Sequence, residues 1–166
     1  MKQRPFFTIV IPTYRRFDQL RECLHSIRRL DYPRDDFEVV VVDDGSPSSP
    51  GSIVKPFQSQ FNVRLVIQPH AGPATARNRG VSEASGAFKA IPDDDCMPAP
   101  DWLTRLKSRL DADPGSVVAG NTVNTLTDNP YSTASQMLID YLNAYYNKEN
   151  ARFLTSNNIA LSKEVF

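Results

Sequence analysis

The sequence has few cysteines, no excess of one charge and no long apolar run, and each absence excludes a class of protein. Two cysteines in 166 residues are too few for a disulfide framework, which favours reduced thiols and a cytoplasmic location. Nineteen basic and nineteen acidic residues give a formal net charge of +0, so no overall field attracts nucleic acid. No apolar run reaches membrane-spanning length, and we expect no transmembrane segment.

Short apolar runs alternate with helical patterns along the chain. The expected strands cover residues 6–11, 37–42, 63–67, 88–91 and 117–119. The expected helices begin at Asp18, Ile53, Gly72-Pro73, Asp101 and Ser132. This alternation predicts an α/β fold with a mostly parallel, Rossmann-like sheet and helices on both faces. The length is that of one domain, spanning residues 1–166.

Two acidic clusters follow expected strands. Asp93-Asp94-Asp95 come after the fourth strand, and Asp43-Asp44 close the second. Because adjacent carboxylates repel each other, a triplet at one strand end suggests a cation, and a divalent ion that also takes phosphate oxygens fits. The carboxyl ends of parallel strands share one edge, which suggests one site. The alternatives are a solvated acidic turn for the triplet and, for Asp43, a turn or cap through Gly45-Ser46.

Two more segments belong to the same expected edge. Pro12-Thr13-Tyr14-Arg15 follows the first strand, and Gly72-Pro73 opens a helix with proline at its first position. The free N–H groups and positive end of that helix suit a phosphate, and Arg77, one turn inside, is within reach of an anion. The alternative is that Arg77 and Arg79 are solvated arginines on a helix face. His70 is assigned no role.

In this order the four segments resemble the nucleotide-binding half of family-two glycosyltransferases, over nearly the whole chain from Phe7 to Phe166. The resemblance implies an inverting enzyme of the GT-A fold. It would transfer a sugar from a nucleoside diphosphate sugar, with a UDP-sugar the first choice, to an acceptor hydroxyl, with Mg²⁺ or Mn²⁺ as cofactor. The implied acceptor is a saccharide or a lipid-linked saccharide. The expected location is cytoplasmic, either free or peripheral at the inner face of the membrane.

The resemblance also assigns roles to residues. Tyr14 would form the aromatic wall of a uracil-type base, and Asp44 would accept from the ring N–H. Asp95 matches the metal ligand, and Asp93 would meet the ribose or the metal shell. The residues placed against the nucleotide are Pro12, Thr13, Tyr14, Asp44, Arg77, Asp93 and Asp94.

Asn157 and Asn158 have a counterpart in the family near the donor sugar and the acceptor. Amide side chains bond sugar hydroxyls as donors and as acceptors, although turn and cap roles suit them equally. The helix from Ser132 to Asn147 carries an apolar and tyrosine-rich face. This face is expected to pack on the core, and the alternative is contact with a lipid-linked acceptor.

Two departures from the family pattern stand out. Lys89 lies in the strand before the aspartates, where a charge is costly unless it is paired. The general base of the family is a carboxylate shortly beyond the region that ends here at Phe166, and Glu164 does not match its motif. The chain is therefore expected to be C-terminally truncated, lacking the acceptor and base region, and to have low activity alone.

Three other classes of protein share parts of this pattern. A sugar nucleotidyltransferase-like domain also uses Mg²⁺, but it needs a glycine-rich loop where Pro12-Thr13-Tyr14-Arg15 stands. A phosphoacceptor receiver domain would have an acid after the third strand, where Gln68-Pro69-His70 follows. A non-catalytic nucleotide-sugar binding module is the main alternative, because it needs no general base.

Overall fold

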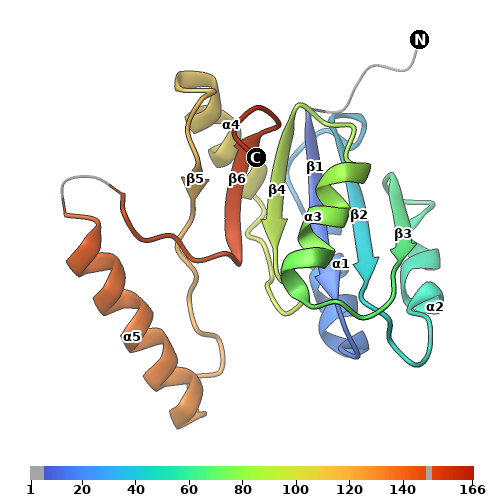
Figure 1. Ribbon diagram of the computed structural model, residues 1–166, viewed down its shortest axis with the longest axis horizontal. Coiled ribbons are helices and arrows are strands. Elements are labelled where there is room, and N and C mark those ends of the chain that lie inside the picture. The colour runs from blue at the N-terminus through green and yellow to red at the C-terminus, as the bar shows by residue number, and fades with distance from the viewer. Residues whose placement is uncertain (1–5, 149–150) are drawn as a thin grey trace.

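A computed structural model describes residues 6–148 and 151–166 as an α/β structure built on one sheet (Figure 1). The strands are β1 (Phe7–Thr13), β2 (Phe37–Asp43), β3 (Val63–Ile67), β4 (Phe88–Pro92), β5 (Val118–Ala119) and β6 (Asn158–Ser162). The helices are α1 (Phe17–Arg28), α2 (Gly51–Val54), α3 (Pro73–Glu83), α4 (Trp102–Ala112) and α5 (Pro130–Tyr146), with 3-10 turns at Arg34–Asp36 and Lys55–Phe57.

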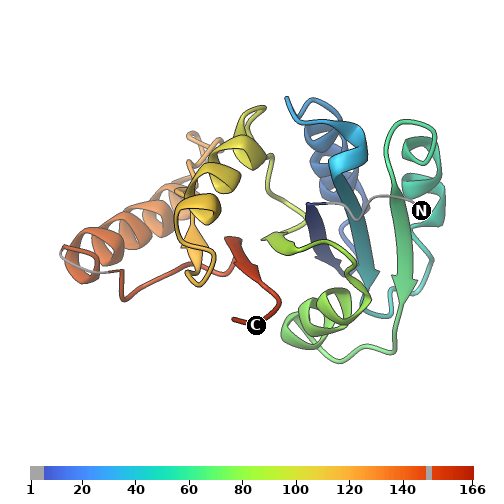
Figure 2. The same ribbon diagram turned by 90° about the horizontal axis from the view of Figure 1, so that it is seen from above.

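The sheet has six strands in the order β3-β2-β1-β4-β6-β5. Strands β1 to β4 are mutually parallel, and β6 is antiparallel to both of its neighbours. Figure 2 shows α3 on one side of the sheet and α1 and α4 on the other. The predicted fold class, a mostly parallel sheet with helices on both faces, is therefore confirmed.

The strand β6 was not predicted from the sequence. Five residues carry too little pattern to separate a strand from a loop. In the structure Asn158 is in register with Pro92, and Ser162 with Phe88. The chain thus re-enters the sheet beside β4 and brings Asn158 to the end of that strand which carries the aspartates.

The boundaries of β1 also differ from the prediction. A strand ending before Pro12 was expected, yet β1 continues through Pro12 and Thr13, in register with β2. The pairing of β1 with β4 stops at Ile9. At Pro12 the strand therefore has a neighbour on one side only, and a proline without an N–H is tolerated there. Thr13 is carried to the edge of the sheet as a result.

Helix α3 lies unusually close to the strands under it. A Cβ added to Gly80 would come within 2.2 Å of Val10 Cγ1 and 3.1 Å of Val42 Cγ2. A glycine is required at this position because any larger residue would push the helix away from the sheet. The close approach sets the height of α3, and with it the position of Arg77, over the carboxyl edge.

The helix caps differ in part from the prediction. Asp18 was expected to cap the first helix, but Arg16 is the residue at the cap position and Asp18 lies in the first turn. Asp101 is at the cap of α4, as expected, but its side chain makes no capping hydrogen bond and instead pairs with Arg105. The side chain that does cap a helix is Asn129, at α5.

The expectation that α5 packs on the core is wrong. No residue of α5 is buried, and Tyr141 is 62% exposed. Figure 1 shows the helix standing apart from the sheet. An amphipathic spacing indicates that one face of a helix is apolar but does not say what covers it. In the described part of the chain no helix is long and apolar enough to cross a membrane.

Lys89, the unexpected charge, is buried as part of a polar row. Lys89, Thr8 and Glu38 are register neighbours on β4, β1 and β2. The ammonium of Lys89 donates to the carbonyl oxygen of Gly86 at 2.7 Å. Glu38 accepts from the Thr8 hydroxyl, from Ser85 and from Arg64. A cation and an anion thus share one buried face at the amino ends of the strands, away from the aspartates.

Glu38 is therefore expected to stabilise the fold. Burial alone would raise the pKa of Glu38, but hydrogen bonds from Thr8, Ser85 and Arg64 outweigh it and hold the pKa below its usual value. Glu38→Ala leaves these donors unpaired and should lower the free energy of unfolding by about 2–4 kcal/mol in urea titrations.

The same pKa shift predicts a pH dependence. The lowered pKa means that the stabilising contribution is present above the unfolded value, about 4.3, and is lost as the pH falls through the folded value. The control is Asp111→Ala, which removes an exposed partner of Lys107 and should change stability by less than about 0.5 kcal/mol. Equal losses in both variants would contradict the assignment.

Candidate functional site

The predicted site residues come together at the carboxyl edge of the sheet. Thr13 and Asp43 end β1 and β2 in register with each other. The aspartate triplet follows β4, and Asn158 begins β6 beside Pro92. Parallel topology produces this gathering, because every strand of the parallel set releases its following loop at the same edge. Residues more than 140 positions apart in the sequence thus border one site.

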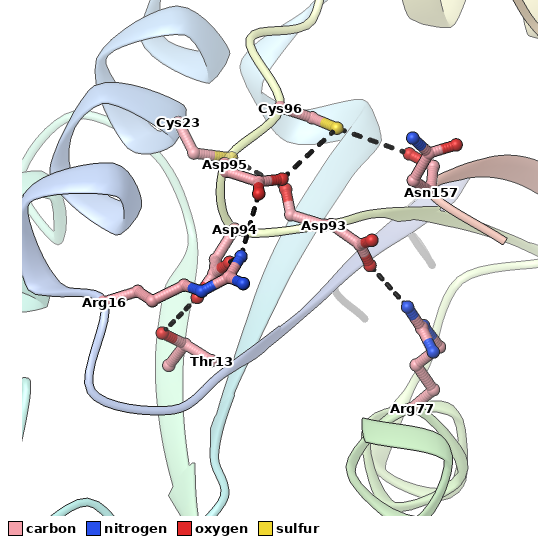
Figure 3. A network of polar contacts seen from close by, with 9 residues as sticks. All are labelled: Thr13, Arg16, Cys23, Arg77, Asp93, Asp94, Asp95, Cys96 and Asn157. Carbon is pink, nitrogen blue, oxygen red and sulfur yellow. Dashed lines mark hydrogen bonds and ion pairs between the residues drawn. The ribbon is translucent and has the colours of Figure 1, made fainter. Parts of the chain in front are cut away.

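The three aspartates point in different directions (Figure 3). Asp93 pairs with Arg77 of α3 at 2.5 Å. Asp94 is buried, and its carboxylate accepts from the Thr13 hydroxyl at 2.8 Å. Asp95 is exposed and pairs with Arg16 at 2.8 Å. Each carboxylate therefore has a donor from a different element, which reduces the repulsion within the triplet.

Burial affects the ionisation of the triplet. The pKa of Asp94 is raised, chiefly because burial disfavours the charged form. The Thr13 hydroxyl and Arg16 oppose this shift, and the neighbouring Asp95 adds to it. The pKa of Arg16 is raised in turn, with Asp94 the largest cause. These shifts reflect a carboxylate that depends on nearby cations to remain charged.

Asp44 lies in a cage of donors from the loop before α3. Its carboxylate accepts from the backbone N–H groups of Ala71 and Gly72, both at 2.9 Å, and from Gln68 at 2.7 Å. The Nδ1 atom of His70 lies 2.8 Å from the same carboxylate. Asp44 thus ties the end of β2 to the start of α3, a structural role that the sequence did not suggest.

Tyr14 and His70 form a stacked pair beside this cage. Their ring centroids are 4.2 Å apart with an interplanar angle of 21°, and the Arg15 guanidinium lies over the Tyr14 ring. His70, for which the sequence predicted no role, therefore contacts both Tyr14 and Asp44, the two residues expected to bind the nucleobase. Its contacts join positions 14, 44 and 70, which only the folded chain brings together.

Asp43 makes the turn contacts that were one of its two predicted roles. Its Oδ1 atom accepts from the backbone N–H and the hydroxyl of Ser46, as expected for a turn. Its Oδ2 atom is buried without a hydrogen-bond partner among the described residues. The Nε atom of Arg77 is likewise buried and unpartnered among them. Unsatisfied polar atoms of this kind need an explanation such as a water, an ion or a ligand.

A cavity of about 680 Å³ opens beside Asp95. It lies between the loop after β4, the loop after β5 and helix α5, and Asn121, Ser132 and Gln136 are among the polar residues that line it. Asp95 is the carboxylate among the lining residues that the structure describes. The volume and the mixture of polar and apolar walls are those of a small-molecule site.

The two predicted asparagines line this cavity but differ in their contacts. Asn158 is committed to the fold, because its Oδ1 accepts from the Trp102 indole N–H at 2.9 Å and its Nδ2 donates to the Asn121 carbonyl. Asn157 has a buried Oδ1 that lacks a partner within the described residues. Of the two, Asn157 is the one with an unsatisfied acceptor, and Asn158 positions Trp102.

Cys96 is a further wall residue that the sequence did not single out. Its Sγ lies 3.7 Å from the carbonyl oxygen of Asn157. Burial, with smaller contributions from the neighbouring aspartates, raises the pKa of Cys96 to about 11. The group is thus a neutral thiol at ordinary pH, and it links the aspartate loop to the start of β6 (Figure 3).

Glu164 lies away from this site. Strand β6 runs antiparallel to β4, so its end at Ser162 is beside Phe88, at the opposite edge of the sheet from the aspartates. Glu164 follows that end and is exposed. It is therefore remote from any reaction at the carboxyl edge, which agrees with its mismatch to the base motif.

The donor set suits a hard divalent cation. Carboxylate oxygens are the ligands that Mg²⁺ and Mn²⁺ prefer, usually one or two from the protein with phosphate oxygens completing the shell. Across the described residues, no three acidic, histidine or cysteine side chains converge on a common point. Asp95 lines the cavity and pairs with the Arg16 guanidinium. A positively charged partner already accepted by this carboxylate fits a metal site with one or two protein ligands.

The structural role of Asp44 gives a testable prediction. Burial alone would raise the pKa of Asp44, but hydrogen bonds from Ala71, Gln68 and Gly72 hold it below its usual value. Asp44→Ala leaves the two backbone N–H groups unpaired and should lower the free energy of unfolding by about 1–3 kcal/mol. The contribution of Asp44 is present above its unfolded pKa, about 3.9, and is lost as the pH falls through the lower pKa of the folded state.

Urea titrations at neutral and acidic pH measure this effect. The control is Asp35→Ala, an exposed carboxylate in the turn before β2, for which little change is expected. If Asp44→Ala unfolds at the same urea concentration as wild type, the donor cage does not stabilise the fold.

The mostly parallel sheet with acidic motifs at its carboxyl edge matches solved glycosyltransferases, and the fold is of the GT-A class. The family model of glycosyl transferase family 2 matches residues 8–166. The chain therefore belongs to this family.

A sequence relative and two solved structures illustrate the similarity. Glycosyltransferase AglE of Haloferax volcanii is 29% identical over 164 residues, which are 98% of this chain and 52% of that protein. Mannosyltransferase PcManGT from Pyrobaculum calidifontis, solved with GDP-Man and Mn²⁺, has a TM-score of 0.77 at 26% identity over 98% of this chain and 46% of that one. TarS of Staphylococcus aureus, solved with UDP-GlcNAc, has a TM-score of 0.63 at 28% identity over 72% and 37%. The chain thus spans about half the length of AglE and of the mannosyltransferase.

Proposed function

We propose that the chain is the donor-binding part of an inverting glycosyltransferase. It would bind a nucleoside diphosphate sugar, a UDP-sugar in the first place, and present it to a hydroxyl of an acceptor saccharide or lipid-linked saccharide. The observation that carries this proposal is the convergence of the four predicted motifs at one sheet edge, next to a cavity of about 680 Å³. The complexes of PcManGT with GDP-Man and of TarS with UDP-GlcNAc support the same class of donor.

The nucleobase is proposed to bind near Tyr14 and Asp44. An aromatic ring offers a stacking surface, and a carboxylate accepts from a base N–H. His70 and Gln68 already contact Asp44, so one of these contacts would have to be exchanged for the contact to the base. His70 is the more exposed of the two side chains, which makes it the easier one to move. Pro12 and Thr13 contribute through the backbone and through the bond from Thr13 to Asp94.

The diphosphate is proposed to bind between the aspartate triplet and the start of α3. Arg77 lies on the first turns of that helix, and its Nε is free of partners among the described residues. Asp95 and Asp93 would hold a divalent cation, and the cation would neutralise charge on the departing diphosphate. Asp93 would exchange its contact with Arg77 for a contact with the cation or the ribose. Asp94 would stay bonded to the Thr13 hydroxyl and would contact hydroxyls of the sugar or the ribose.

The transferred sugar and the acceptor are proposed to share the cavity beside Asp95. Asn157 offers an unpartnered amide oxygen, and the serine hydroxyls and Gln136 amide of α5 line the opposite wall. Proton removal from the acceptor needs a base, and Glu164 at the other edge is not placed for it. The whole protein is proposed to act in the cytoplasm, free or peripheral at the inner face of the membrane.

Nucleotide binding tests this proposal directly. Calorimetry with UDP and with GDP, each with and without Mn²⁺, should give metal-dependent affinity for one of them. Asp95→Ala removes the proposed metal ligand and should weaken that affinity at least about tenfold, equivalent to roughly 1.4 kcal/mol. The control is Asp101→Ala, whose carboxylate pairs with Arg105 outside the cavity and should leave affinity unchanged.

Two results would count against the proposal. Metal-dependent binding of full strength in Asp95→Ala would remove Asp95 from the metal site. No binding of either nucleotide by a folded wild-type chain would remove the donor-binding function itself. A non-catalytic binding module would show the same affinities without sugar transfer in the whole protein.

A further inference from the structure

Arg16 is the cation at the centre of the aspartate triplet, and neither the motifs nor the comparisons assign it a role. It lies in the loop between β1 and α1, at the cap position of α1. Its Nη1 atom is 2.8 Å from Asp95 Oδ2 and 3.3 Å from Asp94 Oδ1. Figure 3 shows the guanidinium reaching across to both carboxylates from the opposite side to Arg77. One cation thus bridges two acids that are adjacent in the chain.

The need for that cation follows from the burial of Asp94. The side chain of Asp94 is 6% exposed and sits beside a second carboxylate. A buried carboxylate next to a like charge is unfavourable unless a positive charge is close. Arg16 supplies that charge.

Arg16 can give up these contacts more easily than Arg77. Its side chain is 53% exposed, whereas that of Arg77 is 18% exposed. The side chain of Arg16 makes no capping bond to α1, and its pair with the half-exposed Asp95 is of the exposed kind, which is worth only about 0–1 kcal/mol. The pair between Arg16 and Asp95 is therefore weak enough to be exchanged.

We propose that Arg16 is an exchangeable counterion that couples the metal to the nucleotide. Before the cation binds, Arg16 neutralises Asp94 and Asp95. A divalent cation at Asp95 takes the oxygen that Arg16 holds, so the guanidinium is displaced when the cation binds. The diphosphate of the donor then offers the displaced guanidinium a new anion. This inference rests on the proposed metal and nucleotide sites.

The proposal has a thermodynamic consequence. A cation that binds alone must break the Arg16 pair without compensation, so its affinity is reduced. When the diphosphate is present the same displacement is compensated, so each ligand raises the affinity for the other by an equal factor. Without the guanidinium at position 16, the cation should bind better alone and the coupling factor should fall.

Mn²⁺ binding in the absence of nucleotide tests the first half. Free Mn²⁺ is measured by electron paramagnetic resonance with wild type, Arg16→Gln and Arg16→Lys. Arg16→Gln should bind Mn²⁺ about three- to tenfold more tightly, and Arg16→Lys, which keeps the charge, should stay near wild type. The matched control is Arg21→Gln, an exposed arginine of α1 that pairs with Asp18, for which no change is expected.

Calorimetry with UDP or GDP, with and without Mn²⁺, tests the second half. The factor by which Mn²⁺ raises nucleotide affinity should be smaller in Arg16→Gln than in wild type. A second measurement needs no variant: the Nε–H signal of Arg16 in the wild-type NMR spectrum should shift when diamagnetic Mg²⁺ is added. This NMR measurement tests the displacement of Arg16 even if Arg16→Gln does not fold.

The outcomes separate this inference from the proposed function. If Mn²⁺ binding depends on Asp95 but is unchanged or weaker in Arg16→Gln, the counterion exchange is wrong and the metal site stands. If Mn²⁺ binds independently of Asp95, or does not bind even with nucleotide present, the counterion exchange and the proposed metal site are both wrong, whereas the donor-binding proposal depends only on nucleotide affinity. An Arg16 signal that does not move with Mg²⁺ bound at Asp95 also overturns the exchange.

Discussion

Repulsion among carboxylates at one edge of the sheet is the constraint on which the arrangement of this chain depends. Asp43, Asp44 and the triplet Asp93-Asp94-Asp95 are released at the same edge because β2 and β4 are parallel. Donors from other elements of the fold compensate the negative charge of these carboxylates. Asp44 takes backbone N–H groups at the start of α3, Asp94 takes the Thr13 hydroxyl, and Asp93 and Asp95 take arginines. A change in any of these elements would alter the charge balance of the whole edge.

The compensation is uneven, and this unevenness suggests where ligands act. Asp44 and Asp94 are both buried. Asp44 is held by three short hydrogen bonds and Asp94 by the Thr13 hydroxyl, so both behave as parts of the scaffold. Asp95 and its partner Arg16 are each about half exposed, at 50% and 53%, and border the cavity. Strong bonds in the interior keep the geometry, while the exposed pair can be exchanged at little cost. Exchange of contacts with a ligand is therefore expected to cost least at Asp95 and Arg16.

The sequence predicted much of the framework. The strand over Val63–Ile67 has the predicted bounds, and the other parallel strands are correct to within two residues at each end. Apolar runs and proline at the start of α3 carry local signals strong enough for this. The short strand β6 has no such signal, since its pairing with β4 comes from 66 or more residues away in the chain. The outward face of α5 was mistaken for core because spacing shows amphipathicity but not a partner.

The sequence by itself determined the class of fold, the order of the motifs and the identity of most residues at the edge, because strand termini and parallel connections follow from local patterns. The tertiary structure alone decided which partner each acid has. Arg16 meets Asp95 across 79 positions, His70 meets Tyr14 across 56, and Trp102 meets Asn158 across 56. Hydrogen bonds and ion pairs act over only a few ångströms, and no local pattern encodes which distant side chains will come within that range.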